Sequence, residues 1–181
     1  MNNTYAFPET MTADVFKTIR TYVGMNKKEF ADFCDVSQKT ISRYESGTAK
    51  IDGPISRLLY LLYLDLVDVK KLEVPAKEYN VRFLYKCNGL ICSVIDVDDI
   101  KKRIKVKNFT NSTNLKAFGD NPNPTYDDYL SLLEERCVPK TRHLIGEYLK
   151  YIGVPFYDPF LIVMKTKGIM EGDFFSLEFV D

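Results

Sequence analysis

The sequence of 181 residues contains no tryptophan, a single histidine and four scattered cysteines, and its formal net charge is zero. Because His143 is the only imidazole, a nucleophilic site of the Ser-His-Asp or Cys-His type would have to use it. Cys137 lies nearby in the sequence, but a packed or surface-exposed His143 is the better interpretation. One histidine and four separate cysteines also lack the ligand spacing of a zinc site. We therefore expect no catalytic residues, no metal, no cofactor and no enzymatic activity.

Long apolar segments and export signals are also missing. No stretch approaches the roughly 20 apolar residues that a membrane-spanning helix needs. The first ten residues have neither the basic region nor the apolar region of a signal peptide. The four cysteines form no CxxC pair, which favours reduced thiols. Together these absences predict a cytoplasmic protein without a membrane partner.

What the sequence does contain, in its first third, is helical periodicity. Val15, Phe16, Ile19 and Val23 repeat at the spacing of one helix face, and Gly24 ends this pattern. A second, a third and a fourth helix should follow. We expect these helices to form a compact domain over residues 1–68.

Local capping signals mark where those later helices begin. Asn26 is followed three residues on by Glu29, which is the pattern of a capping box. Ser37 is suited to cap a third helix that Gly47 ends, and Pro54 is suited to the first turn of a fourth helix. The third helix should therefore span about residues 37–46.

The pattern changes after a charged stretch with Pro75, which we interpret as a linker over residues 69–80. Alternating apolar residues then flank Asn88-Gly89, a strong hairpin signal. In a two-residue hairpin Cys92 would face Tyr85, diagonal to Cys87, which suits packing better than a disulfide.

The rest of the chain mixes strands and helices. A third strand is expected over 104–110, helices over 126–136, 141–152 and about 157–168, and a final strand in DFFSLEF. The expected fold is thus an all-α N-terminal domain of four to five helices joined to a small α+β C-terminal domain, a β-hairpin or antiparallel sheet plus helices. The expected boundaries are 1–68, a linker at 69–80, and 81–181.

Residues 27–46 have the spacing of a helix-turn-helix. Ala31 is small enough for two helices to cross closely, and Asp35 tolerates the left-handed backbone that the turn requires. Val36 and Ile41 supply the apolar contacts between the two helices, and Glu45 is better suited to a bond within the domain than to reading a base.

The stretch NKKEFADFCDVSQKTISRYESGTAKIDGPISRLLYLL resembles the Cro/repressor (XRE-type) helix-turn-helix family, and the resemblance covers residues 12–66. Lys27 stands where that family often has a glutamine, and Asp35 where it usually has a glycine. The resemblance implies that the 37–46 helix enters the major groove of double-stranded DNA.

The side chains on that helix include groups that can recognise base edges, because glutamine pairs with adenine and arginine or lysine with guanine. The expected base contacts are Gln38, Lys39, Thr40, Ser42 and Arg43. The expected phosphate contacts are Lys27, Lys28, Ser37, Thr48 and Lys50.

A second basic feature lies in residues 70–110, which hold ten basic against five acidic groups. Its densest part comprises Lys101, Lys102, Arg103, Lys105 and Lys107. On a strand, the last three of these would share one face. This stripe is a candidate patch for nucleic acid or a partner, and the alternative is a charged edge strand that blocks aggregation.

Residues 126–179 resemble a segment of uncharacterised proteins of bacteria and their phages, through ERCVPKTR, YDPF and KTKGIM. This resemblance implies a mobile-element setting and no activity. The overall interpretation is a sequence-specific DNA-binding transcription regulator, a phage or mobile-element repressor. It is expected to form a homodimer through the leucine-rich helix 55–66 or through the second domain.

A second class of function stays open. An anti-CRISPR-like inhibitor would bind an effector nuclease, as a protein or nucleoprotein partner, through its C-terminal domain, while its helix-turn-helix regulates its own promoter. An antitoxin is a third interpretation.

Overall fold

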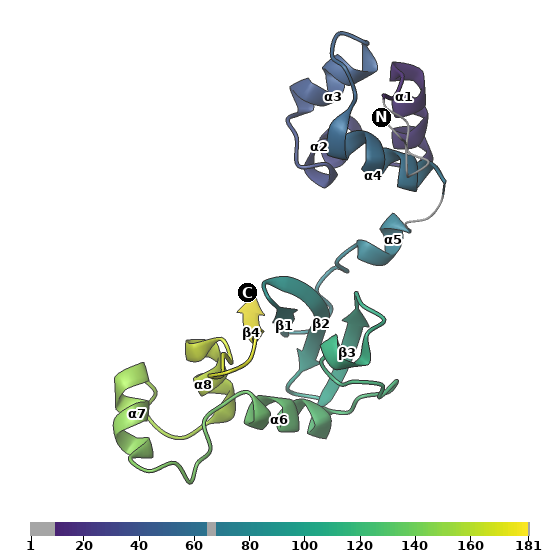
Figure 1. Cartoon of the computed structure of the whole chain (residues 1–181). Helices are drawn as coiled ribbons and strands as arrows, with labels where there is room; N and C mark the ends of the chain where they lie inside the picture. The colour runs from purple at the N-terminus through teal and green to yellow at the C-terminus, as the bar shows by residue number, and fades with distance from the viewer. Residues whose placement is uncertain (1–9, 65–67, 181) are drawn as a thin grey trace. The chain divides into compact units, whose positions relative to one another are not determined.

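The computed structural model describes residues 10–64 and 68–180. The chain divides into two compact units, residues 1–73 and 74–181. The first unit is helical and the second combines a four-stranded antiparallel sheet with helices (Figure 1), so the expected fold class is confirmed.

Among its described residues, the first unit contains four helices of seven or more residues: α1 (Ala13–Tyr22), α2 (Lys27–Phe33), α3 (Gln38–Glu45) and α4 (Gly53–Tyr63). The predicted caps are in place. Asn26 and Glu29 form a reciprocal capping box at α2, and the Ser37 hydroxyl accepts a hydrogen bond from the Thr40 backbone N–H at α3. Pro54 lies in the first turn of α4.

The core of this unit is built from one face of each of these helices. Phe16 of α1 packs edge-on against Phe30 of α2, with ring centroids 5.5 Å apart. Leu59 and Leu62 of α4 are buried in the same cluster, so the leucine-rich helix serves mainly as core. A backbone bridge between Met11 and Ile51 joins the segment before α1 to the segment before α4.

The expected linker over 69–80 carries regular structure at its start and fixed contacts at its end. Val69–Leu72 forms the short helix α5, which Asp68 caps. In the second unit, Arg82 donates a hydrogen bond to the carbonyl of Pro75 at 2.8 Å, and the Glu78 backbone N–H donates to Asp96 at 3.0 Å. The stretch expected to be a linker thus contains one short helix without buried residues and, at its end, two contacts with the second unit.

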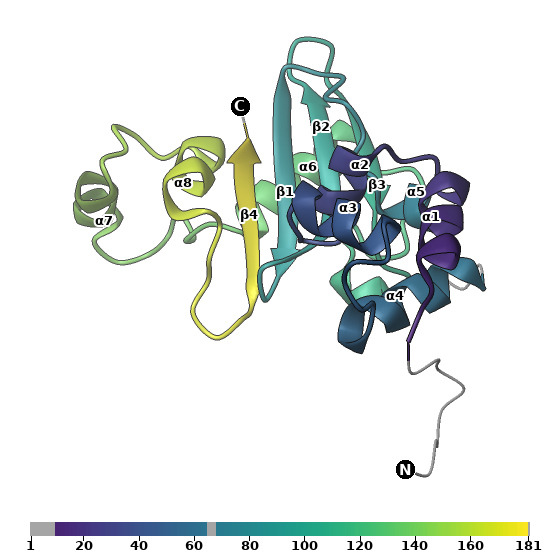
Figure 2. The same ribbon diagram turned by 90° about the horizontal axis from the view of Figure 1, so that it is seen from above.

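Four strands form the sheet of the second unit in the order β3-β2-β1-β4 (Figure 2). They are β1 (Val81–Cys87), β2 (Leu90–Asp98), β3 (Arg103–Asn108) and β4 (Phe175–Val180). Asn88 and Gly89 both have positive φ, at 50° and 79°, as a tight hairpin turn between β1 and β2 requires. The hairpin, the third strand and the final strand are thus present as predicted.

The register of this hairpin differs from the expected one. Tyr85 pairs with Ser93 and Lys86 pairs with Ile91, which leaves Cys92 as an extra residue in a β-bulge. The expected pairing of Cys92 with Tyr85 is therefore wrong. All four cysteines are free thiols.

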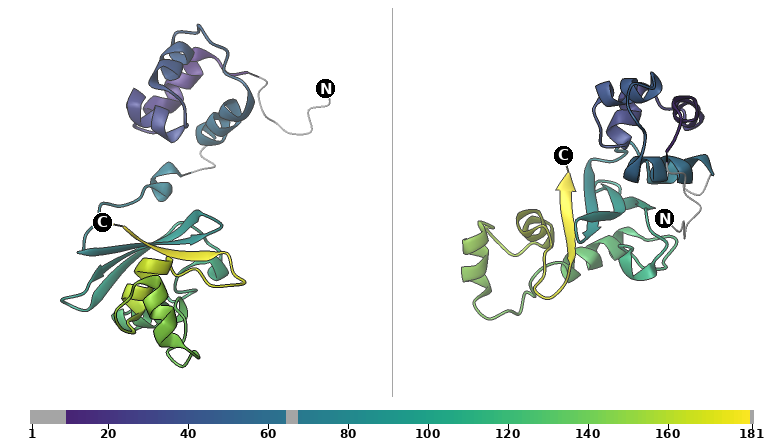
Figure 3. Two further views of the ribbon diagram at one scale, coloured as in Figure 1. Left: turned by 90° about the vertical axis from the view of Figure 1, so that its left-hand side faces the viewer. Right: turned by 45° about the horizontal axis from the view of Figure 1, so that its top comes forward.

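The helices of the second unit, α6 (Tyr126–Glu135), α7 (Ile145–Ile152) and α8 (Pro159–Thr166), lie on one side of the sheet (Figure 3, left). The expected helix over 141–152 begins only at Ile145, because Leu144 has a left-handed backbone with φ of 56°. His143 therefore lies exposed in a loop rather than on a helix. Cys137 is buried and its thiol lies 3.4 Å from the Tyr157 hydroxyl.

Arg136 ties the end of α6 to the last part of the chain. Its guanidinium donates two hydrogen bonds to the Gly168 carbonyl, at 3.0 and 2.8 Å, and pairs with Asp173 at 2.6 Å. Gly168 has φ of 57°, and an added Cβ there would lie 3.1 Å from Arg136 and 3.2 Å from Leu177. A side chain at this position would therefore crowd Arg136 and Leu177 and disturb the contacts of Arg136 with the segment before β4.

Candidate nucleic-acid interface

The turn between α2 and α3 holds the two helices in a fixed corner. Asp35 adopts the left-handed backbone, with φ of 52°, and the Val36 N–H donates to the Ala31 carbonyl at 3.0 Å. Ile41 is fully buried, and the Tyr44 ring lies 5.4 Å from that of Phe16. The apolar side of α3 is therefore fixed against the core, which leaves its other side to solvent.

Gln38, Lys39, Ser42 and Arg43 form the exposed face of α3, and the name α3 face is used for these four residues below. Residues 38 and 42, like 39 and 43, are one helical turn apart and so lie side by side. Within the described part of the chain, none of the four side chains has a hydrogen-bonding or ionic partner. These groups are free to bind a ligand without first breaking an internal contact.

Thr40 differs from its neighbours on this helix. Its side chain is half-buried, and its hydroxyl lies 2.8 Å from the Ser37 hydroxyl. Ser37 also accepts from the Thr40 N–H at 3.0 Å. Thr40, expected to contact a base, and Ser37, expected to contact a phosphate, are thus hydrogen-bonded to each other in the cap of α3.

Glu45 at the end of α3 holds two basic side chains. Its carboxylate accepts from Arg20 at 2.6 Å and lies 2.9 Å from the Lys27 ammonium. Burial disfavours the charged form of Glu45, but the hydrogen bonds and charges of Lys27 and Arg20 outweigh it and lower the pKa of this carboxyl. Lys27, expected at a phosphate, is therefore already engaged inside the unit.

The other expected phosphate contacts are exposed on the same unit. The ammonium of Lys28 has no partner within the described ranges, whereas Lys50 pairs with Asp52 at 2.9 Å. The Thr48 hydroxyl donates to the Arg43 carbonyl at 3.2 Å. Lys28 is thus the expected phosphate contact with the most available positive charge.

The basic stripe on β3 and the turn before it has carboxylate partners. Arg103 donates to Asp98 at 2.9 Å, and Lys102 pairs with Asp99 at 3.0 Å. Lys105 pairs with Glu78. These contacts neutralise most of the stripe, which favours the structural interpretation of a charged edge strand over a second nucleic-acid patch.

Arg103, Lys105 and Lys107 lie at alternating positions of β3 as expected, and Lys107 lies over the Phe109 ring at 5.2 Å. Lys101 precedes the strand, and its backbone N–H donates to Asp98 at 3.0 Å. The expected stripe therefore exists as a surface feature.

Residues 10–64 and 68–180 contain neither a metal-binding cluster nor a membrane-spanning helix. No group of three or more His, Cys, Asp or Glu side chains comes together there in a way that could hold a metal ion. Over the same ranges, every helix is too short or too polar to cross a membrane.

A two-helix corner that presents an unpaired polar helix face defines the first unit as a helix-turn-helix, a class of DNA-binding domain. Residues 16–59 match the family model described as Helix-turn-helix, which agrees with the resemblance noted in the sequence. The match covers less than half of the chain and supports a DNA-binding regulator of this type. No curated protein and no solved structure matches the chain significantly.

The sequence did not reveal the partners of Glu45 or the cap contact of Thr40. Arg20 lies 25 positions before Glu45, so no local spacing links the two. The Ser37–Thr40 contact has a local signal, because a hydroxyl three residues after a serine cap lies within reach of it.

Proposed function

We propose that the protein is a sequence-specific transcriptional repressor that binds its operator by placing α3 in the major groove. The observation that carries the proposal is the α3 face, whose four polar side chains are exposed and unpaired within the described residues, on a helix fixed by Ile41. Gln38 suits adenine, and Lys39 and Arg43 suit guanine. Ser42 lies beside them with a hydroxyl that can serve either base.

Phosphate contacts in this proposal come from residues around the helix ends. Lys28 and Lys50 supply positive charge, and Thr48 supplies a hydroxyl. Thr40 and Ser37 act mainly through the cap that orients α3. Lys27 stays with Glu45 and contributes to the positive field rather than a direct contact.

The proposed repressor acts as a homodimer, because one helix-turn-helix reads only a half-site and two readers must lie about 34–36 Å apart on the duplex. Leu59 and Leu62 are buried in the first unit, and the exposed apolar side chains at the end of α4, Tyr63 at 55% and Leu64 at 45%, are the alternative dimer contact. Exposed apolar side chains flank α7 in the second unit, with Leu144 at 63% and Phe156 at 60% exposure. We place the subunit contact there.

Selection of bound sequences from randomised duplex DNA, using the full chain, tests both parts of the proposal. We expect enrichment of a two-fold symmetric site with half-sites about 10 base pairs apart. A single enriched half-site would contradict the dimer, and the absence of enrichment would contradict sequence-specific binding.

The second candidate function is inhibition of an effector nuclease, with the helix-turn-helix regulating the protein's own promoter. The exposed apolar residues that flank α7 also favour it, since such side chains suit a protein interface. If the protein is monomeric while a nuclease co-purifies with it and loses activity, this function replaces repression as the main role of the second unit.

A further inference from the structure

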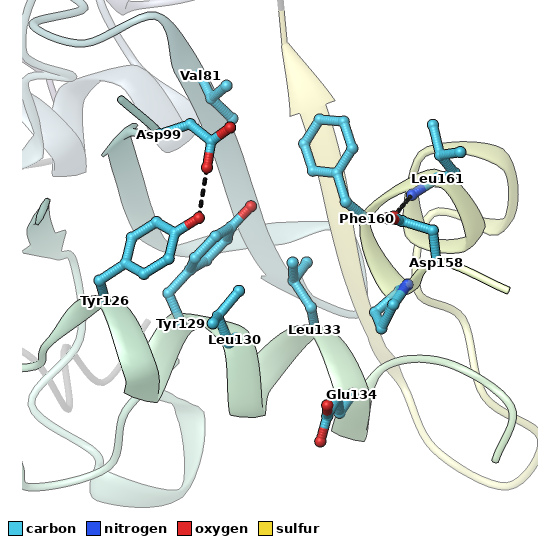
Figure 4. Close-up of a pocket in the computed structure, with 11 residues that line it drawn as sticks. Val81, Asp99, Tyr126, Tyr129, Leu130, Leu133, Glu134, Asp158, Phe160 and Leu161 are labelled. Atoms are coloured by element: carbon cyan, nitrogen blue, oxygen red, sulfur yellow. Dashed lines mark hydrogen bonds between the residues drawn. The ribbon is translucent and has the colours of Figure 1, made fainter. Parts of the chain in front are cut away.

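A cavity of about 450 Å³ lies in the second unit between the start of β1, helix α6 and the start of α8 (Figure 4). Its volume falls within the range of small-molecule sites, roughly 300–1,000 Å³. Val81, Leu130, Leu133 and Phe160 supply apolar walls. These walls suit a ligand with an apolar body about the size of an aromatic ring.

Tyr129 supplies the polar group of this cavity. The residue is only 3% exposed, and its ring packs against those of Tyr126 and Phe83, at centroid distances of 5.5 and 6.1 Å. In Figure 4 its hydroxyl points away from α6, toward the space between Val81 and Phe160. No hydrogen-bond partner for this hydroxyl occurs among the described residues, and its oxygen is not fully buried, so it is accessible from the cavity.

The charged groups at the cavity are mainly acidic. Asp158 caps α8 through the Leu161 N–H at 2.9 Å, and Asp99 lies across the cavity beside Tyr126 (Figure 4). Lys102 is bound to Asp99 at 3.0 Å. Burial raises the pKa of Tyr129, and the charges of Asp99 and Asp158 raise it further, so the hydroxyl stays neutral in a negative field.

We propose that this cavity binds a small organic cation with an apolar body, of the arylalkylamine class. The apolar part fills the space between Leu133 and Phe160, while the ammonium donates to the Tyr129 hydroxyl and lies near Asp158, because Asp99 is already paired with Lys102. An anion is disfavoured by the carboxylates, and a neutral alcohol lacks the attraction to them. The site lies within the second unit and is independent of DNA binding.

The test is calorimetric titration of the full chain with three matched probes: 2-phenylethylamine, 2-phenylethanol and 3-phenylpropionate. We expect the amine to bind at least fivefold more tightly than the alcohol and the anion to bind most weakly. Tyr129→Phe keeps the ring and removes only the hydroxyl, and it should weaken the amine about fivefold, as loss of one hydrogen bond of about 1 kcal/mol implies.

Tyr151→Phe is the matched control, because Tyr151 is 88% exposed on α7 and lies outside the cavity lining. It should leave amine binding unchanged. Three results would each overturn the proposal: no binding of the amine, equal binding of the alcohol or the anion, or unchanged amine binding in Tyr129→Phe with a native circular dichroism spectrum.

Discussion

The α3 face and the β3 stripe are both rich in basic and polar side chains, yet the structure treats them differently. On α3, Lys39 and Arg43 have no partner among the described residues. On the stripe, Lys102, Arg103 and Lys105 each pair with a carboxylate. The two surfaces therefore differ in how much positive charge is left unpaired, rather than in the density of basic residues along the sequence.

The largest expected effect comes from removing side chains on each of the two surfaces. Gln38→Ala combined with Lys39→Ala should weaken operator binding about 100-fold, since each good base contact contributes about 1–3 kcal/mol. Lys102→Ala combined with Lys105→Ala should change it less than twofold. Gel-shift titration against the selected operator measures both.

If the two double variants lose the same affinity for the operator, the distinction between the α3 face and the β3 stripe is wrong. Non-specific DNA serves as the control: the α3 variant should lose its preference for the operator while keeping most of its binding to unrelated duplex, because phosphate contacts persist.

A smaller effect is expected from a change at Glu45. Its carboxylate binds Lys27, whereas the side chains of the α3 face have no such partner among the described residues. Glu45→Gln should destabilise the first unit by about 2 kcal/mol, below the roughly 3–5 kcal/mol of a fully buried ion pair, because the Lys27 side chain is 44% exposed. Urea unfolding monitored by circular dichroism measures this change.

The pH dependence of the same variant gives a second measurement. The pKa of Glu45 in the folded protein lies below its ordinary value of 4.5, so its contribution is complete above that value and is lost as the pH falls through the folded pKa. The wild-type protein should therefore lose more stability on acidification than Glu45→Gln. Parallel curves for the two proteins would show that the pair contributes nothing.

The smallest effect concerns single lysines. Lys28→Ala should weaken binding to the operator and to unrelated DNA by a similar factor, several-fold in each case. It should also reduce the slope of log affinity against log salt by about 1. Lys102→Ala, the matched change on the β3 stripe, should leave the slope unaltered, because the Lys102 ammonium is paired with Asp99. An equal change in slope for both variants would place DNA on the second unit as well. Affinity measured over a salt series distinguishes these outcomes.

The features that could be predicted from the sequence are those that depend on neighbours. The Asn26–Glu29 capping box, the left-handed Asp35 and the Asn88-Gly89 turn all arise within a few residues, so their spacing alone specifies them. The α3 face follows in the same way from helical periodicity once Ile41 is assigned to the core.

Apart from the Ser37–Thr40 contact, the features that were missed have no local signal in the sequence. The pairing of Arg20 with Glu45 and the contacts of Arg136 with Gly168 join positions 25 and 32 residues apart. The bulge at Cys92 depends on how the strands meet across the sheet, and the left-handed Leu144 interrupts a pattern that reads as helical. Spacing in the sequence carries no signal for any of them.

Because β4 pairs with β1, the segments that form the two units become complete at different times during synthesis. Phe83 of β1 pairs with Phe179 of β4, so the sheet of the second unit lacks its edge strand β4 until residues 175–180 have emerged from the ribosome. The buried core of the first unit is built from residues between Phe16 and Leu62. A nascent chain can thus carry a folded DNA-binding unit while its second unit still exposes apolar surface, a period in which a chaperone would have reason to bind.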